Sequence, residues 1–501
     1  MIISDRRIWI PRALAGSAAL AGIAAWIVYF HAGLVLSHFD AKAHLVVSRR
    51  VFDNITPGWQ QVGAVWLPLP HLLQILPAQV DLLYRTGAAA SAISIASFAV
   101  AAYATARLVI AVTGSTVGAA AAVAMLALNP NLLYLQATPM TEPLLLAVSW
   151  LALLWLYEWV VQDRDEVPRR LGWALVAATL TRYEAWAIVG AALIAVVYAM
   201  WRRGVPVRQL TRRAIRVSIW PAAAVVVFLV NSRITAGRWL VVDGFFVPDP
   251  TYQGQAWRTL VSLWWGTHQL SGYTIEIVAL AVAAVLCARV FVWRDEAAFL
   301  IPVALLAAAA LPMSAFLDGH PYRIRYMIPL VAASVTITGI GVGLARRAAP
   351  FLAAVLVASA LIESPPWDVH APMLVEAKID HSNSEGRRHV TACLAASYRG
   401  EKILASMASL AHYMQELSYA GFTIADFVNE GNGTIWDLAL ETGPAPHAGW
   451  MLAEERARGG DLLAERIRRK PAFTAHMVPV CEGGGVRLYK RVGEAPFRNA
   501  E

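Results

Sequence analysis

Apolar runs long enough to cross a lipid bilayer recur along most of this chain. A helix needs about 20 apolar residues to span a hydrocarbon core about 30 Å thick, and many runs between residues 13 and 362 reach or approach that length. The runs are continuous and lack the apolar–polar alternation of β-barrel strands. Only 15% of the 501 residues are charged, whereas soluble domains carry about 25%. The chain is therefore predicted to be a polytopic α-helical membrane protein.

The runs and the loops between them predict a topology. Eleven transmembrane helices are expected, at about residues 13–30, 86–112, 116–135, 143–161, 171–180, 185–201, 217–231, 275–292, 297–316, 327–345 and 351–362. With this count, the side of the N-terminus, which itself carries Arg6, Arg7 and Arg12, also receives the Arg-bearing segments "QDRDEVPRR", "RRGVPVRQLTRRAIR", "ARVFVWRD" and "ARRAAP". Basic loops stay in the cytoplasm. We therefore expect an uncleaved N-terminal anchor with a cytoplasmic N-terminus, and a C-terminus on the opposite side.

The last part of the chain, residues 363–501, is polar and reads as alternating short strands and helices. Strands are expected at 402–407, 422–428, 449–455, 475–481 and 486–492, and helices at 408–421, 434–442 and 460–470. This pattern predicts a small extracytoplasmic α/β domain. "CEGGG" lies between two strands and favours a turn over a phosphate-binding loop. Cys393 and Cys481 could form a disulfide in an oxidising compartment, whereas Cys287 lies within a span.

The first external loop, residues 31–85, begins with an acid close to the end of the first span. If "FDAKAHLVVSRRVFD" is helical, Asp40 and His44 share one face, and Lys42, Arg49 and Asp53 line up on another. A carboxylate held at the membrane surface can act as a general base toward a hydroxyl. The alternative is a structural ion pair of Asp40 with Lys42, His44 or an arginine. "WLPLPHLL" is expected to lie along the membrane rather than to cross it.

Further ionisable residues on the same side have no role in orientation. Such groups near the bilayer are costly, so they are candidates for function. Glu142 precedes Pro143 and an apolar run, and the helix dipole alone could account for it. Arg182 and Glu184 interrupt a short span. Two interpretations are open for them: they bind a substrate, or they form an ion pair with each other. "HPYRIRY" predicts an anionic partner for its two arginines, either a lipid phosphate held by guanidinium groups or the bulk headgroups.

Three segments resemble the GT-C superfamily of integral-membrane glycosyltransferases, which use polyprenyl-phosphate-linked sugars. They are "HFDAKAH" after the first span, "ATPMTEPLLLA" at the outer end of a later span, and "HPYRIRYMIPL" entering a late span. Protein O-mannosyltransferases and the aminoarabinose transferases that act on lipid A belong to this superfamily. The likeness covers about residues 10–345. It implies a transmembrane catalytic domain over residues 1–362, followed by the soluble domain that many members append outside.

The resemblance also implies roles for individual residues. Asp40 would be the base in an inverting transfer to an acceptor hydroxyl, and Glu142 would be a second acid that orients sugar or acceptor. Arg325, with Arg323 nearby, would neutralise the departing polyprenyl phosphate, and Arg182 is a second candidate for this. The full set of expected substrate-binding residues is Lys42, His44, Arg49, Arg182, Glu184, His320, Arg323, Arg325 and Tyr326.

Many members carry a second acid beside the first, but Ala41 and Lys42 follow Asp40 here, so neither a metal nor another cofactor is expected. The expected partners are a polyprenyl-phosphate-linked sugar, a glycan, lipid or protein acceptor, and the bilayer of a bacterial inner membrane. The net charge of +8 reflects loop arginines and does not indicate nucleic acid.

Two other functions remain open from the sequence. A transporter or flippase of a lipid-linked or anionic substrate would use a site near the midplane, inverted repeats and broken helices. The two halves of the chain show no such similarity, and the unexplained charges gather at one interface. A ligase or polymerase of lipid-linked glycans would share the donor class, but it would not need an acid directly after the first span.

Overall fold

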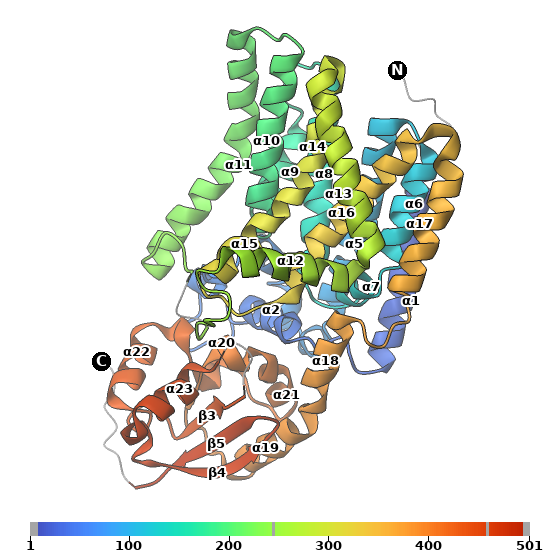
Figure 1. Ribbon diagram of the computed structural model, residues 1–501. Coiled ribbons are helices and arrows are strands. Elements are labelled where there is room, and N and C mark those ends of the chain that lie inside the picture. The colour runs from blue at the N-terminus through green and yellow to red at the C-terminus, as the bar shows by residue number, and fades with distance from the viewer. Residues whose placement is uncertain (1–8, 243–245, 457–459, 494–501) are drawn as a thin grey trace.

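The computed structural model describes residues 9–242, 246–456 and 460–493, and a bundle of long apolar helices forms its largest part (Figure 1). Within these ranges eight helical segments are long and apolar enough to cross a membrane, or nine if the bent pair α6 (Thr116–Ala127) and α7 (Pro130–Gln136) is one span. The eight are α1 (Trp9–His31), α5 (Ala88–Thr113), α8 (Glu142–Val161), α10 (Glu184–Arg202), α11 (Val207–Ala236), α13 (Tyr273–Val292), Arg294–Leu317 and Ile324–Leu344.

The predicted polytopic helical class is confirmed, but the count of eleven spans is not. Helices α9 (Arg169–Thr179) and α17 (Ala349–Glu363) occupy the two remaining predicted positions and have only 11 and 15 residues. The segment Arg294–Leu317 is an irregular series of short helices that ends in α15 (Ala310–Leu317). The basic stretch 202–216, which we expected to be a loop, is largely helical because α11 begins at Val207.

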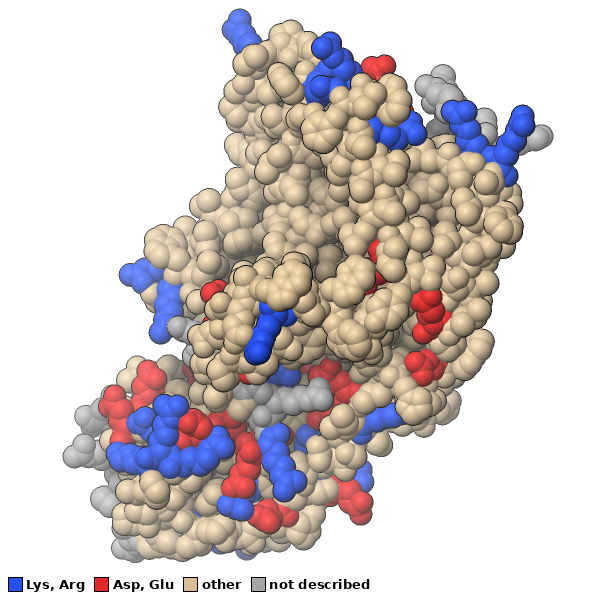
Figure 2. Space-filling view, in the orientation of Figure 1, with Lys and Arg blue, Asp and Glu red and all other residues tan. Residues whose placement is uncertain are grey.

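Charge is unevenly distributed along the molecule. Lysines and arginines gather at the end of the bundle far from the strands, an uncharged surface follows, and both signs of charge cover the strand-containing end (Figure 2). Arg213 on α11 is held there by Asp165, at 2.6 Å from Nη2 to Oδ1. Arg6 and Arg7, on which the predicted cytoplasmic N-terminus partly depends, lie outside the described residues.

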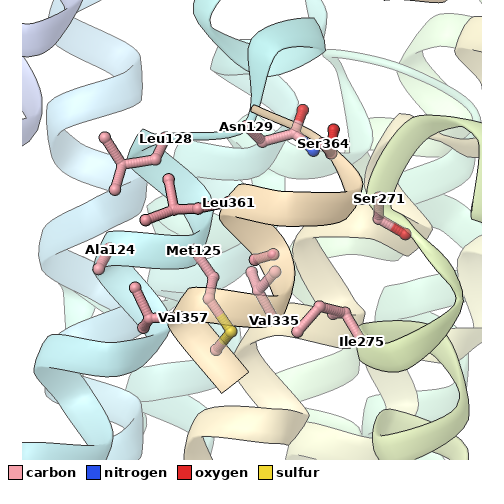
Figure 3. Close-up of a pocket in the computed structure, with 11 residues that line it drawn as sticks. Ala124, Met125, Leu128, Asn129, Ser271, Ile275, Val335, Val357, Leu361 and Ser364 are labelled. Carbon is pink, nitrogen blue, oxygen red and sulfur yellow. The ribbon is translucent and has the colours of Figure 1, made fainter. Parts of the chain in front are cut away.

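Small residues let the bundle helices approach closely. A Cβ atom added at Gly118 of α6 would lie 2.5 Å from the carbonyl oxygen of Gly339 in α16 (Ile328–Leu344). Such small-residue contacts are typical of membrane helices. A gap beside this contact, lined by Met125, Val335 and Val357 among others, has a volume of about 10 Å³ (Figure 3). That volume is about one water-sized probe, so the gap is a packing defect and not a substrate site.

The first external loop lies between the bundle and the strands (Figure 1). It folds into α2 (Phe39–Arg49), α3 (Leu69–Leu72), α4 (Asp81–Thr86) and two 3₁₀ turns, Trp59–Val62 and Pro77–Gln79. Helix α12 (Ala256–Ser271) crosses the bundle axes at the same level. Loop and strand regions are joined by side-chain hydrogen bonds, such as Asn432 Nδ2 to Asn54 Oδ1 at 2.7 Å.

The C-terminal residues form one five-stranded sheet with the order β2-β1-β3-β5-β4. Strand β1 (Ile403–Ala405) is parallel to β2 (Phe427–Val428) and β3 (Trp450–Glu454), whereas β5 (Val486–Arg491) is antiparallel to β3 and β4 (Met477–Gly483). The accompanying helices are α18 (Pro372–Ser382), α19 (Ser384–Ser397), α20 (Met407–Leu410), α21 (Met414–Tyr419), α22 (Thr434–Thr442) and α23 (Leu462–Arg469). We call this part, from α18 to β5, the sheet unit.

The predicted small α/β domain is confirmed, with two differences. Helices α18 and α19 had no counterpart in the prediction, and the predicted strand 422–428 pairs only over Phe427–Val428. The residues before it form a 3₁₀ turn closed by a Thr423–Asp426 capping box. The disulfide between Cys393 and Cys481 is present and joins α19 to β4. "CEGGG" runs from the end of β4 into a turn, as expected, with positive φ at Gly484 and Gly485.

Candidate active site

Asp40 and Arg325 form an ion pair where the bundle meets the first external loop. Asp40 lies in the first turn of α2, and its N–H donates to the His38 ring that caps this helix. Arg325 lies in the 3₁₀ turn Ile324–Met327 that leads into α16, and its Nη2 pairs with Asp40 Oδ2. Both side chains are buried. A charge out of water needs a partner of opposite sign, so each of these groups holds the other in place.

The pair continues into a chain of five alternating charges. Arg325 Nη1 lies 3.1 Å from Glu142 Oε1, and Arg182 Nη1 approaches the same oxygen at 3.2 Å. Arg182 also contacts Glu184 at 2.8 Å and donates to the hydroxyl of Thr141 at 2.8 Å. Glu142 is the first residue of α8 and is fully buried. The predicted Arg182–Glu184 pair exists, but it is one end of a network that reaches Asp40.

Charge in this network keeps Asp40 ionised. Burial alone would raise the pKa of Asp40, but the Arg325 guanidinium, with His38 and Arg323, outweighs it, and the pKa lies below its ordinary value. The three carboxylates and two guanidiniums together carry a formal net charge of −1. Arg323, which borders the same spaces as Asp40, balances that charge.

Two cavities meet at Arg325. The larger, of about 730 Å³, is bordered by the charged residues Arg182, Glu184, Asp318 and Arg325. The rest of its wall is mostly apolar and includes Leu67, Val241, Val242, Phe246, Leu311 and Ala315. The second cavity, of about 520 Å³, is bordered by Asp40 and Arg325 and extends to Met407 and Ala411 of the sheet unit. Arg325 therefore stands between an apolar cavity on the bundle side and a space that Asp40 faces.

A pair of histidines borders the larger cavity. His44 Nδ1 lies 3.0 Å from His71 Nε2, and the His44 ring packs against Trp66 with a centroid distance of 4.3 Å. Burial and the neighbouring ring hold the pKa of His44 well below its ordinary value, and burial lowers the pKa of His71 to about 3. Both rings are therefore neutral at physiological pH, and His44 can exchange hydrogen bonds with a bound ligand without adding charge.

The other predicted residues divide into two groups. His320 and Tyr326 border both cavities, and their side chains meet at 3.3 Å. Lys42 and Arg49 are directed elsewhere. Lys42 Nζ lies 3.0 Å from Asp380 of α18, and Arg49 contacts Asp53 at 2.9 Å and Asp81 at 2.8 Å and stacks over Tyr84.

The sheet unit also borders the site, which was not predicted from the sequence. A third, smaller cavity of about 100 Å³ lies beside Asp40, and four ionisable residues of the sheet unit border it: the half-buried Asp380 and the buried Arg387, His412 and Glu454. Nothing in the sequence near these residues points to the site, because their partners are far away along the chain. Asp380 and Lys42 are 338 residues apart.

The sequence matches no protein-family model and no curated protein. Solved structures do share the fold. The crystal structure of ArnT from Cupriavidus metallidurans bound to undecaprenyl phosphate aligns with a TM-score of 0.55 at 11% identity, covering 94% of this chain and 98% of that chain. The apo structure of the same protein gives 0.52 at 13% identity with the same coverage. The chain has the GT-C fold. The GT-C architecture predicted from three short segments is confirmed over nearly the whole chain.

Proposed function

We propose that this protein transfers a sugar from a polyprenyl-phosphate donor to an acceptor hydroxyl at the outer face of a bacterial inner membrane. The observation that carries the proposal is the pair Arg182 and Arg325 on the wall of a largely apolar cavity of about 730 Å³. Guanidinium groups suit a phosphate, and apolar walls suit a prenyl chain. The GT-C fold supports the donor class, because the ArnT structure with this fold holds undecaprenyl phosphate.

In this scheme residues 1–362 form the catalytic domain and residues 363–501 an extracytoplasmic domain. The N-terminus is cytoplasmic. The distribution of charge supports this orientation, since the basic end of the bundle lies opposite the sheet unit (Figure 2). The positive-inside rule then puts Asp40, Arg325 and the sheet unit outside the cytoplasm.

Phosphate binding would change the balance of charge around Asp40. A phosphodiester that engages Arg325 competes with Asp40 and Glu142, which hold this guanidinium in the structure. As Arg325 turns to the phosphate, its field at Asp40 weakens and the pKa of Asp40 rises. Asp40 thereby becomes a stronger base only when the donor is in place.

The transfer itself is an in-line displacement with inversion. Asp40 accepts the proton of the acceptor hydroxyl while the acceptor oxygen forms a bond to the anomeric carbon. The bond from that carbon to the phosphate oxygen breaks, and its electron pair leaves with the polyprenyl phosphate. Arg182 and Arg325 stabilise the charge that develops on the leaving group. Glu142, held between the two arginines, fixes their positions and orients the sugar.

The second cavity, of about 520 Å³, suits the acceptor. It borders Asp40, whereas the larger cavity does not, and it opens between the bundle and the sheet unit. Donor and acceptor would then approach Arg325 from opposite sides and meet beside Asp40. In this arrangement the base and the arginine that binds the phosphate are neighbours, joined as an ion pair.

The proposal is tested by giving the purified protein in liposomes a panel of radiolabelled polyprenyl-phosphate sugars together with a membrane extract. Transfer of label from a lipid donor to an extract component is expected, and protein-free liposomes are the control. A protein that transfers no label from any donor but moves the labelled lipid across the liposome membrane would be a transporter, and the proposal would be wrong.

A further inference from the structure

Helix α2, which carries Asp40, is held from two opposite sides (Figure 1). On the bundle side Arg325 pairs with Asp40. Lys42 lies two residues further along the helix, so its side chain projects about 200° around the axis from Asp40. There Lys42 Nζ meets Asp380 Oδ2 of α18 at 3.0 Å. The sheet unit and the bundle thus contact opposite faces of this helix.

Asp380 is itself firmly anchored in the sheet unit. Its Oδ1 lies 2.9 Å from Arg387 Nη2 of α19 and 3.9 Å from His412 Nε2. Arg387 and His412 both approach Glu454 of β3, at 3.8 and 3.3 Å. Burial opposes ionisation of Asp380, but Lys42, His412 and Arg387 outweigh it and lower its pKa. The charged carboxylate that holds Lys42 is therefore itself connected to β3 through Arg387 and His412.

Further contacts act on the same turn of α2. Gln415 Nε2 of α21 donates to the carbonyl oxygen of Lys42 at 3.1 Å. The Phe39 ring packs against the His412 ring at a centroid distance of 4.7 Å. His38, which caps the helix, lies 3.7 Å from Glu376 of α18. All these contacts fall within two residues of Asp40, so the sheet unit holds the part of α2 that carries the acid.

We propose that Lys42 and Asp380 are positioning residues that set the location of Asp40, so that the sheet unit controls the rate of the chemical step. The inference rests on the proposed function. It departs from the expectation that Lys42 binds substrate, because the ammonium group is directed to Asp380 and Lys42 borders none of the three cavities described around Asp40 and Arg325. Lys42 acts through the helix rather than on the ligand.

This role predicts a specific kinetic effect. A misplacement of about 1 Å at a reacting group can cost about 100-fold in rate. In the proposed function, donor binding depends on Arg182 and Arg325. Among the ion pairs of the described residues, neither arginine contacts Lys42 or Asp380. Loss of the Lys42–Asp380 pair should therefore lower kcat and leave the donor KM nearly unchanged.

The test compares single and double variants of the full-length protein in the transfer assay. Lys42→Met is expected to lower kcat by about 10- to 100-fold, with the donor KM within about twofold of wild type, and Lys42→Arg should recover most of kcat. The double variant Lys42→Met with Asp380→Asn should lose no more kcat than the more impaired single variant, because both changes remove one interaction.

Arg85→Met is the matched control. Arg85 Nη2 donates to the carbonyl oxygen of Ser418 in α21 at 2.8 Å, so it joins the same loop to the same sheet unit away from Asp40. This variant should keep kcat. An equal loss of kcat in Arg85→Met would mean that the whole interface matters, and it would overturn the positioning role.

Two further results would also overturn it: an unchanged kcat in Lys42→Met, or kcat losses that multiply in the double variant. If Lys42→Met does not fold, Lys42→Gln keeps a donor toward Asp380 without the charge and is measured instead. An inactive wild-type protein would contradict the proposed function, whereas an active wild type with unaffected Lys42 variants would contradict only the positioning role.

Discussion

At the scale of single residues, Arg325 connects the parts of the site. It contacts Asp40 from the first external loop and Glu142 from α8, and it borders both large cavities. Removing one member of a buried ion pair typically costs about 3–5 kcal/mol, because the partner is left uncompensated. A substitution in this network can therefore lower activity simply by destabilising the fold. For this reason the thermal unfolding of each variant is measured beside its kinetics.

The pKa of Asp40 predicts how the reaction depends on pH. Because Arg325 holds this pKa below its ordinary value in the free protein, the acidic limb of kcat/KM should lie below about pH 4. Once phosphate engages Arg325 the pKa rises, so the acidic limb of kcat should lie at higher pH. Initial rates from about pH 3 to about pH 8 at several donor concentrations separate the two limbs. A kcat limb at lower pH than the kcat/KM limb would contradict the scheme.

The two arginines should behave differently when replaced. Arg182 contacts Glu142, Glu184 and Thr141 but not Asp40, so Arg182→Met should raise the donor KM by about 10- to 100-fold, the value of one charged hydrogen bond, with a smaller effect on kcat. Arg325→Met should lower kcat as well, because Arg325 also holds Asp40 in position. Steady-state kinetics with the donor varied check this. Identical effects of the two variants would speak against separate roles.

Glu142 should oppose donor binding while it supports catalysis. Its carboxylate pairs with the guanidinium groups of Arg182 and Arg325, and it adds negative charge where the proposed phosphate would bind. Glu142→Gln is therefore expected to lower the donor KM by roughly threefold to tenfold, since a like charge is removed, and to lower kcat. Direct binding of undecaprenyl phosphate to the variant and to wild type gives the affinity independently. Weaker binding by the variant would contradict this role.

At the scale of elements, the disulfide fixes the helix that carries Arg387 to the edge of the sheet. Cys393 on α19 and Cys481 on β4 are 88 residues apart, and closing a loop of this length stabilises a fold by about 2–4 kcal/mol. The variant with Cys393→Ser and Cys481→Ser should unfold at a lower temperature than wild type. Cys287→Ser, which removes the unpaired cysteine of α13, is the control. Equal unfolding temperatures would mean that the disulfide contributes nothing.

Sequence periodicity predicted those elements that are defined by local patterns. The apolar runs located the bundle helices, and alternating strands and helices located most of the sheet unit. Helices α9 and α17 are shorter than a bilayer requires, so hydropathy could not decide whether they cross it. Helices α18 and α19 were missed because "MLVEAKIDHSNSEGRRHV" mixes polar and apolar residues without a clear helical stripe.

At the scale of the whole molecule, the sequence pointed to the ionisable residues of the candidate site but not to the contacts between them. Asp40, Glu142, Arg182, Glu184 and Arg325 attracted attention because ionisable groups beside a membrane need a reason, and the fold brings all five into one network. Which acid meets which arginine depends on helix packing between distant segments. The contact between Lys42 and Asp380, which are 338 residues apart, also depends on this packing. Neither set of contacts could therefore be predicted from the spacing of residues in the sequence.

In the proposed reaction, Asp40 removes a proton from the acceptor while the sugar leaves its lipid phosphate. The most direct test is the single-turnover rate of sugar transfer by Asp40→Asn, with Asp53→Asn as the matched control. Asp53 is an acid of the same loop that pairs with Arg49 and accepts the Ala425 N–H. Asp40→Asn should lower the rate by at least about 100-fold, and Asp53→Asn should transfer at close to the wild-type rate. Equal transfer by Asp40→Asn and wild type would contradict the account.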